Sequence, residues 1–220
     1  MGENVELTAA DGHKFSAYTA GPAGAERCLV VVQEIFGVNH HIREVCDAFA
    51  AEGYAVASPA LFDRAQRGAE LGYTPEGMAR GRELREKVPE AGVIADIEAA
   101  AAHLGATRIG IVGYCWGGTV AWWGATRSRR FRAAVGWYGG GIAATRTEKP
   151  SCPVQLHFGE TDASISMQDV EAIRAAQPEV EIFVYPAAGH GFGCNERDGY
   201  NREAAELAQQ RTLQFFQAHL

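Results

Sequence analysis

Continuous apolar runs alternate with amphipathic stretches along nearly the whole chain, and this alternation limits the fold more than any other feature. The run at residues 28–32 is rich in β-branched side chains, as expected of a strand buried on both faces. Residues 42–50 instead carry apolar side chains at the spacing of one helical face, and Gly53 follows as a helix end. Strands that alternate with helices predict a mostly parallel central sheet with helices on both faces. Further strands are predicted at residues 54–57, 109–112, 133–137, 154–158 and 182–185.

The N-terminal segment breaks this alternation. Asp11 and Gly12 form a turn dipeptide between short apolar segments at residues 5–7 and 15–18, which predicts an antiparallel hairpin at one edge of the sheet. The polar stretch at residues 62–89 predicts an irregular excursion over the top of the sheet, helical near its end. A chain of 220 residues without a linker-like segment is expected to form a single α/β domain over residues 1–220. Helices are also predicted at residues 78–87, 93–104, 167–176 and 202–220.

The charge balance restricts the partners of the protein. The chain has 20 Lys and Arg against 27 Asp and Glu, a net charge of −7, and no long basic block, which argues against nucleic acid. No apolar run approaches the roughly 20 residues that span a bilayer, and the N-terminus does not have the pattern of a signal peptide. Five scattered cysteines are typical of reduced thiols. We therefore expect a cytoplasmic protein without a membrane partner, either a monomer or a small homo-oligomer.

A glycine-flanked cysteine stands between a predicted strand and a predicted helix. The segment Gly113-Tyr114-Cys115-Trp116-Gly117 fits the nucleophile elbow, in which a tight strand-to-helix turn leaves no room for side chains at the flanking positions. The helix dipole favours the thiolate form of a cysteine at its N-terminus, and the next backbone N–H would point toward a developing oxyanion. The pattern predicts Cys115 as a nucleophile. The alternative is an inert buried cysteine in a glycine-rich turn.

An acid and a histidine follow Cys115 in the order that such an elbow requires. Asp162 comes just after the predicted strand at residues 154–158, and His190 lies in a glycine-flanked loop after the strand at residues 182–185. Catalytic groups of open α/β sheets gather at these carboxyl ends. Each residue alone would fit a turn or a surface loop, but the three types in this order predict a catalytic triad.

A further polar group lies directly after the strand at residues 28–32. In Gln33-Glu34-Ile35-Phe36-Gly37, the Ile35 N–H stands where this fold places its second oxyanion donor. A carboxylate at the mouth of a buried strand is avoided unless something pairs with it, so Glu34 is also a candidate site residue. The alternative is that Glu34 pairs with a nearby arginine and only holds the loop.

These motifs together resemble the dienelactone hydrolase family, the carboxymethylenebutenolidases. The resemblance rests on Gln-Glu-Ile-Phe-Gly, Gly-Tyr-Cys-x-Gly-Gly, the Asp after Gly-Glu-Thr, and Ala-Gly-His-Gly-Phe, and it runs over almost the entire chain. It implies an α/β-hydrolase fold and a hydrolase that cleaves an ester or enol-lactone without a cofactor. It also implies Cys115 as the nucleophile that forms a thioester, His190 as its base and Asp162 as the orienting acid.

The same resemblance implies roles for the neighbouring groups. Glu34 would contact the resting thiol and help to activate it when substrate binds. The backbone amides of Ile35 and Trp116 would form the oxyanion hole.

The resemblance further implies two arginines that hold a carboxylate of the substrate. Arg82 fits the Arg-x-Arg-Glu segment best, and Arg80 is the alternative. The second arginine is expected four residues after His190, where this chain has Cys194, with Arg197 three residues further on. Either Arg197 takes that role or the pocket accepts a different ester or lactone. For Arg80 and Arg197 a solvated helix face is the favoured interpretation.

The remaining cysteines and histidines predict little chemistry. His190 and Cys194, together with His40 and His41, could suggest a metal site, but no second ligand pair has zinc-like spacing, so no metal is expected. Cys194 lies in a predicted loop and is the only expected competitor of Cys115 for alkylation. The other thiols are assigned to strand or helix segments: Cys28, Cys46 and Cys152.

Two other functions stay open at this level. The chain could be a broader carboxylesterase or thioesterase with the same triad. It could also be a catalytically silent hydrolase fold that only binds a ligand.

Overall fold

The computed structural model describes residues 2–220, and its framework is an eight-stranded sheet. The strands are β1 (Glu3–Thr8), β2 (Lys14–Ala20), β3 (Arg27–Val32), β4 (Ala55–Pro59), β5 (Arg108–Tyr114), β6 (Ala133–Trp137), β7 (Val154–Gly159) and β8 (Glu181–Tyr185). Their spatial order is β1-β2-β4-β3-β5-β6-β7-β8. From β4 to β8 neighbouring strands are parallel, whereas β2 is antiparallel to both β1 and β4. The predicted parallel sheet with an N-terminal hairpin is confirmed.

Burial of the strands follows their place in the sheet. Every residue of β6 and β7 is buried, and in β3 only Arg27 is partly exposed, so these strands read as continuous apolar runs. The edge strand β1 alternates between exposed and half-buried residues, as a strand with one solvated face does. Gly12 in the hairpin turn has φ 83°, a conformation that glycine adopts at no steric cost.

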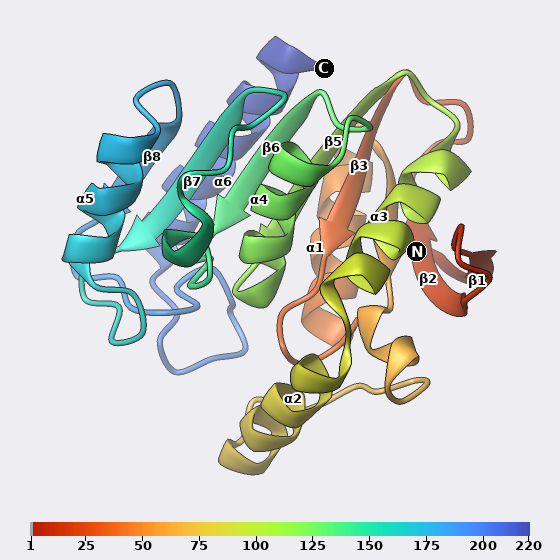
Figure 1. Ribbon diagram of the computed structural model, residues 1–220, viewed down its shortest axis with the longest axis horizontal. Helices are drawn as coiled ribbons and strands as arrows, with labels where there is room; N and C mark the ends of the chain where they lie inside the picture. Colours follow the sequence, from red (N-terminus) through yellow and green to blue (C-terminus); the bar gives the residue numbers. More distant parts are fainter. Residues whose placement is uncertain (1) are drawn as a thin grey trace.

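Helices cover both faces of the sheet (Figure 1). On one face lie α3 (Glu90–Leu104), α4 (Trp116–Arg127) and α5 (Met167–Ala176), and on the other lie α1 (His40–Ala51) and α6 (Arg202–His219). The α2 helix (Pro75–Lys87) lies beyond the carboxyl ends of the parallel strands. Among residues 2–220, no helix combines the length and the apolar character needed to cross a membrane.

Side-chain caps fix where the helices near the carboxyl ends begin. The Asn39 side chain accepts a hydrogen bond from the first turn of α1, and the Thr74 side chain does the same for α2, with Pro75 in its first turn. A capping box of Ser166 and Asp169 starts α5. The Thr74 cap explains why α2 begins earlier than the predicted helix at residues 78–87. Residues 61–64, at the start of the predicted irregular stretch, form a short 3₁₀ helix.

Candidate active site

Cys115 occupies a sharp turn between β5 and α4. Its backbone has φ 55° and ψ −116°, which is strained for a residue with a side chain. The flanking glycines make the turn possible, because a β-carbon on Gly113 would collide with the carbonyl oxygen of Gly117, and one on Gly117 with that of Val32. The turn leaves Cys115 only partly buried, on the wall of a cavity at the carboxyl end of the sheet.

The loops after β7 and β8 bring an acid and a histidine to this thiol. His190 Nδ1 lies 2.8 Å from Asp162 Oδ2, and His190 Nε2 lies 3.2 Å from Cys115 Sγ. The buried Asp162 carboxylate also accepts hydrogen bonds through Oδ1 from the N–H groups of Ser164 at 2.7 Å and Ile165 at 3.2 Å. The structure therefore joins three of the sequence-predicted residues in one continuous chain of carboxylate, imidazole and thiol.

The electrostatics of this chain favour a charged imidazole. Burial by itself lowers the pKa of His190, but the hydrogen bonds to Asp162 and Cys115 outweigh it and raise the pKa to about 10. The ring of Tyr138 also packs edge-on against His190, with centroids 5.3 Å apart. An imidazole held between a carboxylate and a thiol in this way can exchange a proton with the sulfur.

The two residues whose N–H groups are the predicted oxyanion donors line the cavity beside Cys115. Ile35 follows β3, and Trp116 is the first residue of α4; both line the cavity. The first N–H groups of a helix have no acceptor within the helix, and its N-terminus carries partial positive charge. The Trp116 ring stacks on Phe62 with centroids 5.4 Å apart, which holds the start of α4 in place.

Glu34 is completely buried at the end of β3. The Tyr73 hydroxyl donates a hydrogen bond to its Oε2 at 2.8 Å, and Arg197 Nη1 lies 3.5 Å from its Oε1. Within residues 2–220, the hydrogen-bond partner of the Cys115 thiol is His190. The structure thus shows the arginine pairing that the sequence offered as the alternative for Glu34. The physical reason is that a guanidinium and a phenol are stronger donors to a carboxylate than a thiol is.

The cavity has a volume of about 770 Å³ and three arginines in its wall. Arg82 and Arg85 reach it from α2, and Arg82 is exposed, with its Nη2 3.5 Å from Met78 Sδ. Arg80 is not among the lining residues and pairs with Glu83 on the surface of α2, as expected of a solvated helix face. Arg82 is therefore the better placed of the two predicted candidates to meet a ligand.

Arg197 is the third arginine, and the solvated-face interpretation is wrong for it. Its side chain is only 17% exposed, and its guanidinium lies 5.8 Å from the ring centroids of both Phe36 and Tyr73. The Arg197 side chain, on the loop after β8, points inward because its charge offsets the cost of burying the Glu34 carboxylate. Arg197 therefore lines the cavity and neutralises Glu34 at once.

Two predictions about the other thiols are also wrong. Cys194 is fully buried, and burial followed by the charge of Glu34 raises its pKa to about 11, so it is a poor competitor of Cys115. Cys152 lies in the bend before β7 rather than in a strand, where it is partly exposed; burial raises its pKa to about 11 as well. Cys28 and Cys46 are buried, as their assignment to a strand and a helix predicted.

Sequence reasoning missed Arg85 and Tyr73, and it named His41 only as a possible metal ligand without its contact to the loop after β8. Arg85 could have been found, because it stands three residues after Arg82 and shares its helix face. Tyr73 sits in the stretch that the sequence left irregular, and no pattern pairs it with Glu34. His41 lies at the start of α1 within reach of the loop after β8, and only the tertiary structure reveals that contact.

The sheet order, the strained elbow and the catalytic groups on loops at the carboxyl ends define an α/β-hydrolase fold. A solved structure titled "Putative Dienelactone Hydrolase", from Klebsiella pneumoniae, shares this fold with a TM-score of 0.82 and 35% sequence identity, covering 97% of this chain and 98% of that one. The model of the dienelactone hydrolase family matches residues 15–220, so the chain belongs to this family.

Curated relatives agree with the family assignment. The carboxymethylenebutenolidase of Pseudomonas putida is 35% identical over 97% of this chain and 95% of that protein. A Synechocystis protein named "Putative carboxymethylenebutenolidase" is 38% identical over 94% of this chain and 93% of that protein. The protein is therefore a hydrolase that acts on lactone or ester bonds of a small-molecule substrate.

Proposed function

We propose that the protein hydrolyses a carboxylic ester or enol-lactone through a Cys115 thioester. The observation that carries this proposal is the continuous hydrogen-bonded chain from Asp162 through His190 to Cys115 Sγ. It supports a nucleophilic mechanism because the thiol, its base and the group that orients the base lie in hydrogen-bond order. No cofactor is needed for these steps.

In the first half of the reaction, His190 takes the proton of the Cys115 thiol, and the resulting thiolate attacks the carbonyl carbon of the substrate. Negative charge develops on the carbonyl oxygen, where the N–H groups of Ile35 and Trp116 stabilise it. The tetrahedral intermediate collapses, the C–O bond breaks, and His190 gives its proton to the leaving alkoxide or enolate. In the second half, His190 takes a proton from water and the hydroxide attacks the thioester carbonyl. The C–S bond then breaks, the acid product leaves, and His190 returns the proton to the Cys115 thiolate.

The decisive experiment combines alkylation with trapping of the acyl-enzyme. One equivalent of iodoacetamide near neutral pH should inactivate the enzyme and modify Cys115 first, and a slowly hydrolysed aryl ester should add its acyl mass to the same peptide. Cys152→Ser is the matched control, because it removes the other partly exposed thiol and should leave both results unchanged. A label mainly on another cysteine, or an acyl group on an oxygen, would end the Cys115 mechanism. A chain that binds lactone without turning it over would instead be a binding module.

We further propose that the substrate carries a carboxylate held by Arg82. Arg197 is already paired with Glu34, whereas the exposed Arg82 guanidinium lines the cavity without a carboxylate partner among the described residues. A charge-assisted hydrogen bond contributes roughly 1.5–3 kcal/mol, so Arg82→Ala should lower kcat/KM for an acidic lactone about tenfold to a hundredfold. Neutral aryl esters should be nearly unaffected. Equal losses of kcat/KM on both substrates would mean that Arg82 does not hold a substrate carboxylate. They would favour a carboxylesterase of broader specificity.

We also propose that Glu34 activates Cys115. In the resting enzyme the Cys115 thiol would turn from His190 toward Glu34. Substrate binding would displace the thiol from Glu34, and the Glu34 carboxylate would then pair with Arg197. Glu34→Gln keeps the shape but removes the negative charge that would draw the thiol to this side, so kcat should fall strongly while the melting temperature stays near wild type. Tyr73→Phe, which removes one hydrogen bond to Glu34, is the matched control and should have the smaller effect. A lower melting temperature with normal activity per folded molecule would leave Glu34 a structural role only.

A further inference from the structure

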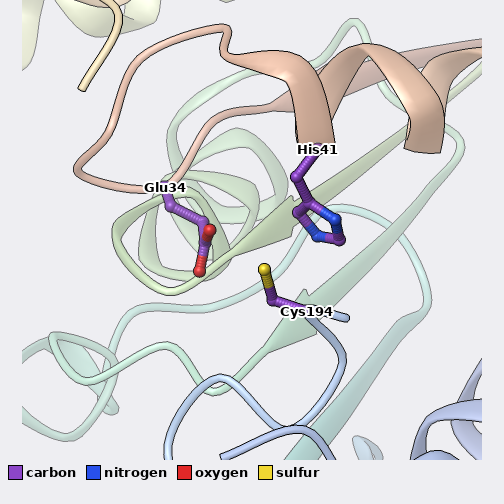
Figure 2. A group of neighbouring side chains, drawn as sticks. All are labelled: Glu34, His41 and Cys194. Atoms are coloured by element: carbon purple, nitrogen blue, oxygen red, sulfur yellow. The ribbon is translucent and has the colours of Figure 1, made fainter. Parts of the chain in front are cut away.

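Three potential metal ligands meet behind the active site, in a buried cluster of Glu34, His41 and Cys194. They come from the end of β3, the first turn of α1 and the loop after β8, segments that are far apart in the sequence. One ligand atom of each, a carboxylate oxygen, an imidazole nitrogen and the sulfur, lies within 4.8 Å of the other two. Figure 2 shows the Cys194 sulfur pointing into the space between the Glu34 carboxylate and the His41 ring.

The His41 ring supplies an independent sign of a ligand. His41 is 4% exposed, and its Nε2 is buried without a hydrogen-bond partner among the described residues. Its Nδ1 lies 3.2 Å from Asn195 Oδ1, which fixes the ring and lets Nδ1 carry the hydrogen. A buried polar atom left without a partner costs free energy, so such atoms are rare in folded proteins. A metal ion would satisfy it, because neutral imidazole nitrogen is a common metal ligand.

We propose that Glu34, His41 and Cys194 bind a divalent cation of the zinc class. A thiolate, an imidazole and a carboxylate suit Zn²⁺, with a fourth position left for water. Zinc–ligand bonds of 2.0–2.3 Å place neighbouring tetrahedral ligands roughly 3.3–3.8 Å apart, so ligand atoms that lie within 4.8 Å of one another would need to close in by at most about 1.5 Å. When the metal–sulfur bond forms, the Cys194 proton passes to solvent.

The site shares a ligand with the hydrolytic centre. Metal on Glu34 would compete with its pairing to Arg197, so an occupied site would restrain hydrolysis. This last consequence rests on the proposed role of Glu34, whereas metal binding itself does not. A second cluster, of His40, Glu44 and Glu196, is exposed, and His40 pairs with both glutamates, so we do not propose a metal site there.

The test uses Co²⁺ as a spectroscopic substitute for Zn²⁺ in the Cys115→Ser protein, where the nucleophile cannot contribute a thiolate. A sulfur-to-cobalt charge-transfer band in the near ultraviolet, with the intense visible bands of a tetrahedral ion, is expected and should be displaced by one equivalent of Zn²⁺. The absence of any charge-transfer band in this protein would overturn the proposal. Because the readout is an absorption spectrum, it is independent of whether Cys115 is the nucleophile.

Variants identify the ligands in the same background. Cys194→Ala should abolish the charge-transfer band, and His41→Gln should weaken Co²⁺ binding at least about tenfold. His40→Gln is the matched control, because it removes the adjacent exposed histidine and should leave the spectrum unchanged. A band that survives Cys194→Ala, or one that disappears with His40→Gln, would place the metal elsewhere and overturn the assignment.

Discussion

Two histidines near the carboxyl side of the sheet, the half-buried His190 and the completely buried His157, have opposite shifts of their pKa. His190 lies between Asp162 and Cys115, and its pKa is raised to about 10. His157, within β7, is completely buried, and this burial lowers its pKa to about 3, with the charge of Arg211 adding to the effect. Burial disfavours the charged ring in both cases, so the difference comes from the partners.

The partners of His157 are all neutral. The Tyr185 hydroxyl lies 2.8 Å from its Nδ1, and Gln155 Oε1 and Thr212 Oγ1 lie 2.9 and 3.2 Å from its Nε2. A neutral imidazole satisfies these groups at both nitrogens, whereas His190 faces an acid and a thiol. The comparison teaches that the charge of the hydrogen-bond partner can outweigh burial in setting the pKa of a histidine, as it does for His190, the proposed base.

The largest effect is expected from the same substitution, His to Gln, at each of the two histidines. His190→Gln should lower kcat/KM by about 10⁴-fold or more, as loss of the base does in hydrolases with a triad, with the fold retained by circular dichroism. His157→Gln should leave kcat/KM per folded molecule near wild type. Comparable activity losses in the two variants would remove the functional distinction between these residues.

The second test is acid unfolding. The folded pKa of His157, about 3, lies below its ordinary value of 6.5, so the unfolded chain takes up the proton first as pH falls. Its contribution to stability is complete above pH 6.5 and is lost toward pH 3, up to about 5 kcal/mol. The free energy of unfolding, measured in urea, should therefore fall less between pH 7 and pH 4 for His157→Gln than for the wild type. His103→Gln, at an exposed histidine, is the control and should retain the wild-type slope.

The third test addresses the charged histidine. Because the pKa of His190 is raised in the folded state, its contribution to stability is complete below pH 6.5 and is lost as pH rises toward 10. Asp162→Asn should lower this pKa more than Cys115→Ser does, since the carboxylate makes the stronger hydrogen bond. NMR titration of the ring protons measures both values. An unchanged pKa in Asp162→Asn would refute the account of partner charge.

The smallest effect is expected at Thr212, a neutral partner of His157. Trp137 Nε1 donates to its hydroxyl at 3.2 Å, so Thr212→Val leaves two buried groups with one partner fewer. We expect a loss of about 1–3 kcal/mol in the free energy of unfolding and no change in kcat. Thr212→Ser keeps the hydroxyl and should recover most of the loss. Equal destabilisation by Ser and Val would mean that packing, not hydrogen bonding, matters at this position.

Local patterns were sufficient for most of the fold. The apolar run of β3 and the helical spacing of α1 follow from short-range periodicity, and the turn at Asp11 and Gly12 from the conformational freedom of glycine. The predicted start of α2 at residue 78 is too late, because the Thr74 cap sets the helix start and leaves no trace in the apolar periodicity. Loops between elements were less predictable, since their course depends on contacts made by distant residues.

The sequence by itself determined the elbow at Cys115 and the order of acid and histidine, because a parallel sheet brings the carboxyl ends of its strands to one edge whatever the details of the loops. Only the tertiary structure decided the surroundings of Glu34. Its partners Tyr73 and Arg197 come from segments whose paths no periodic pattern specifies. They meet because a buried carboxylate must find donors wherever the folded chain supplies them.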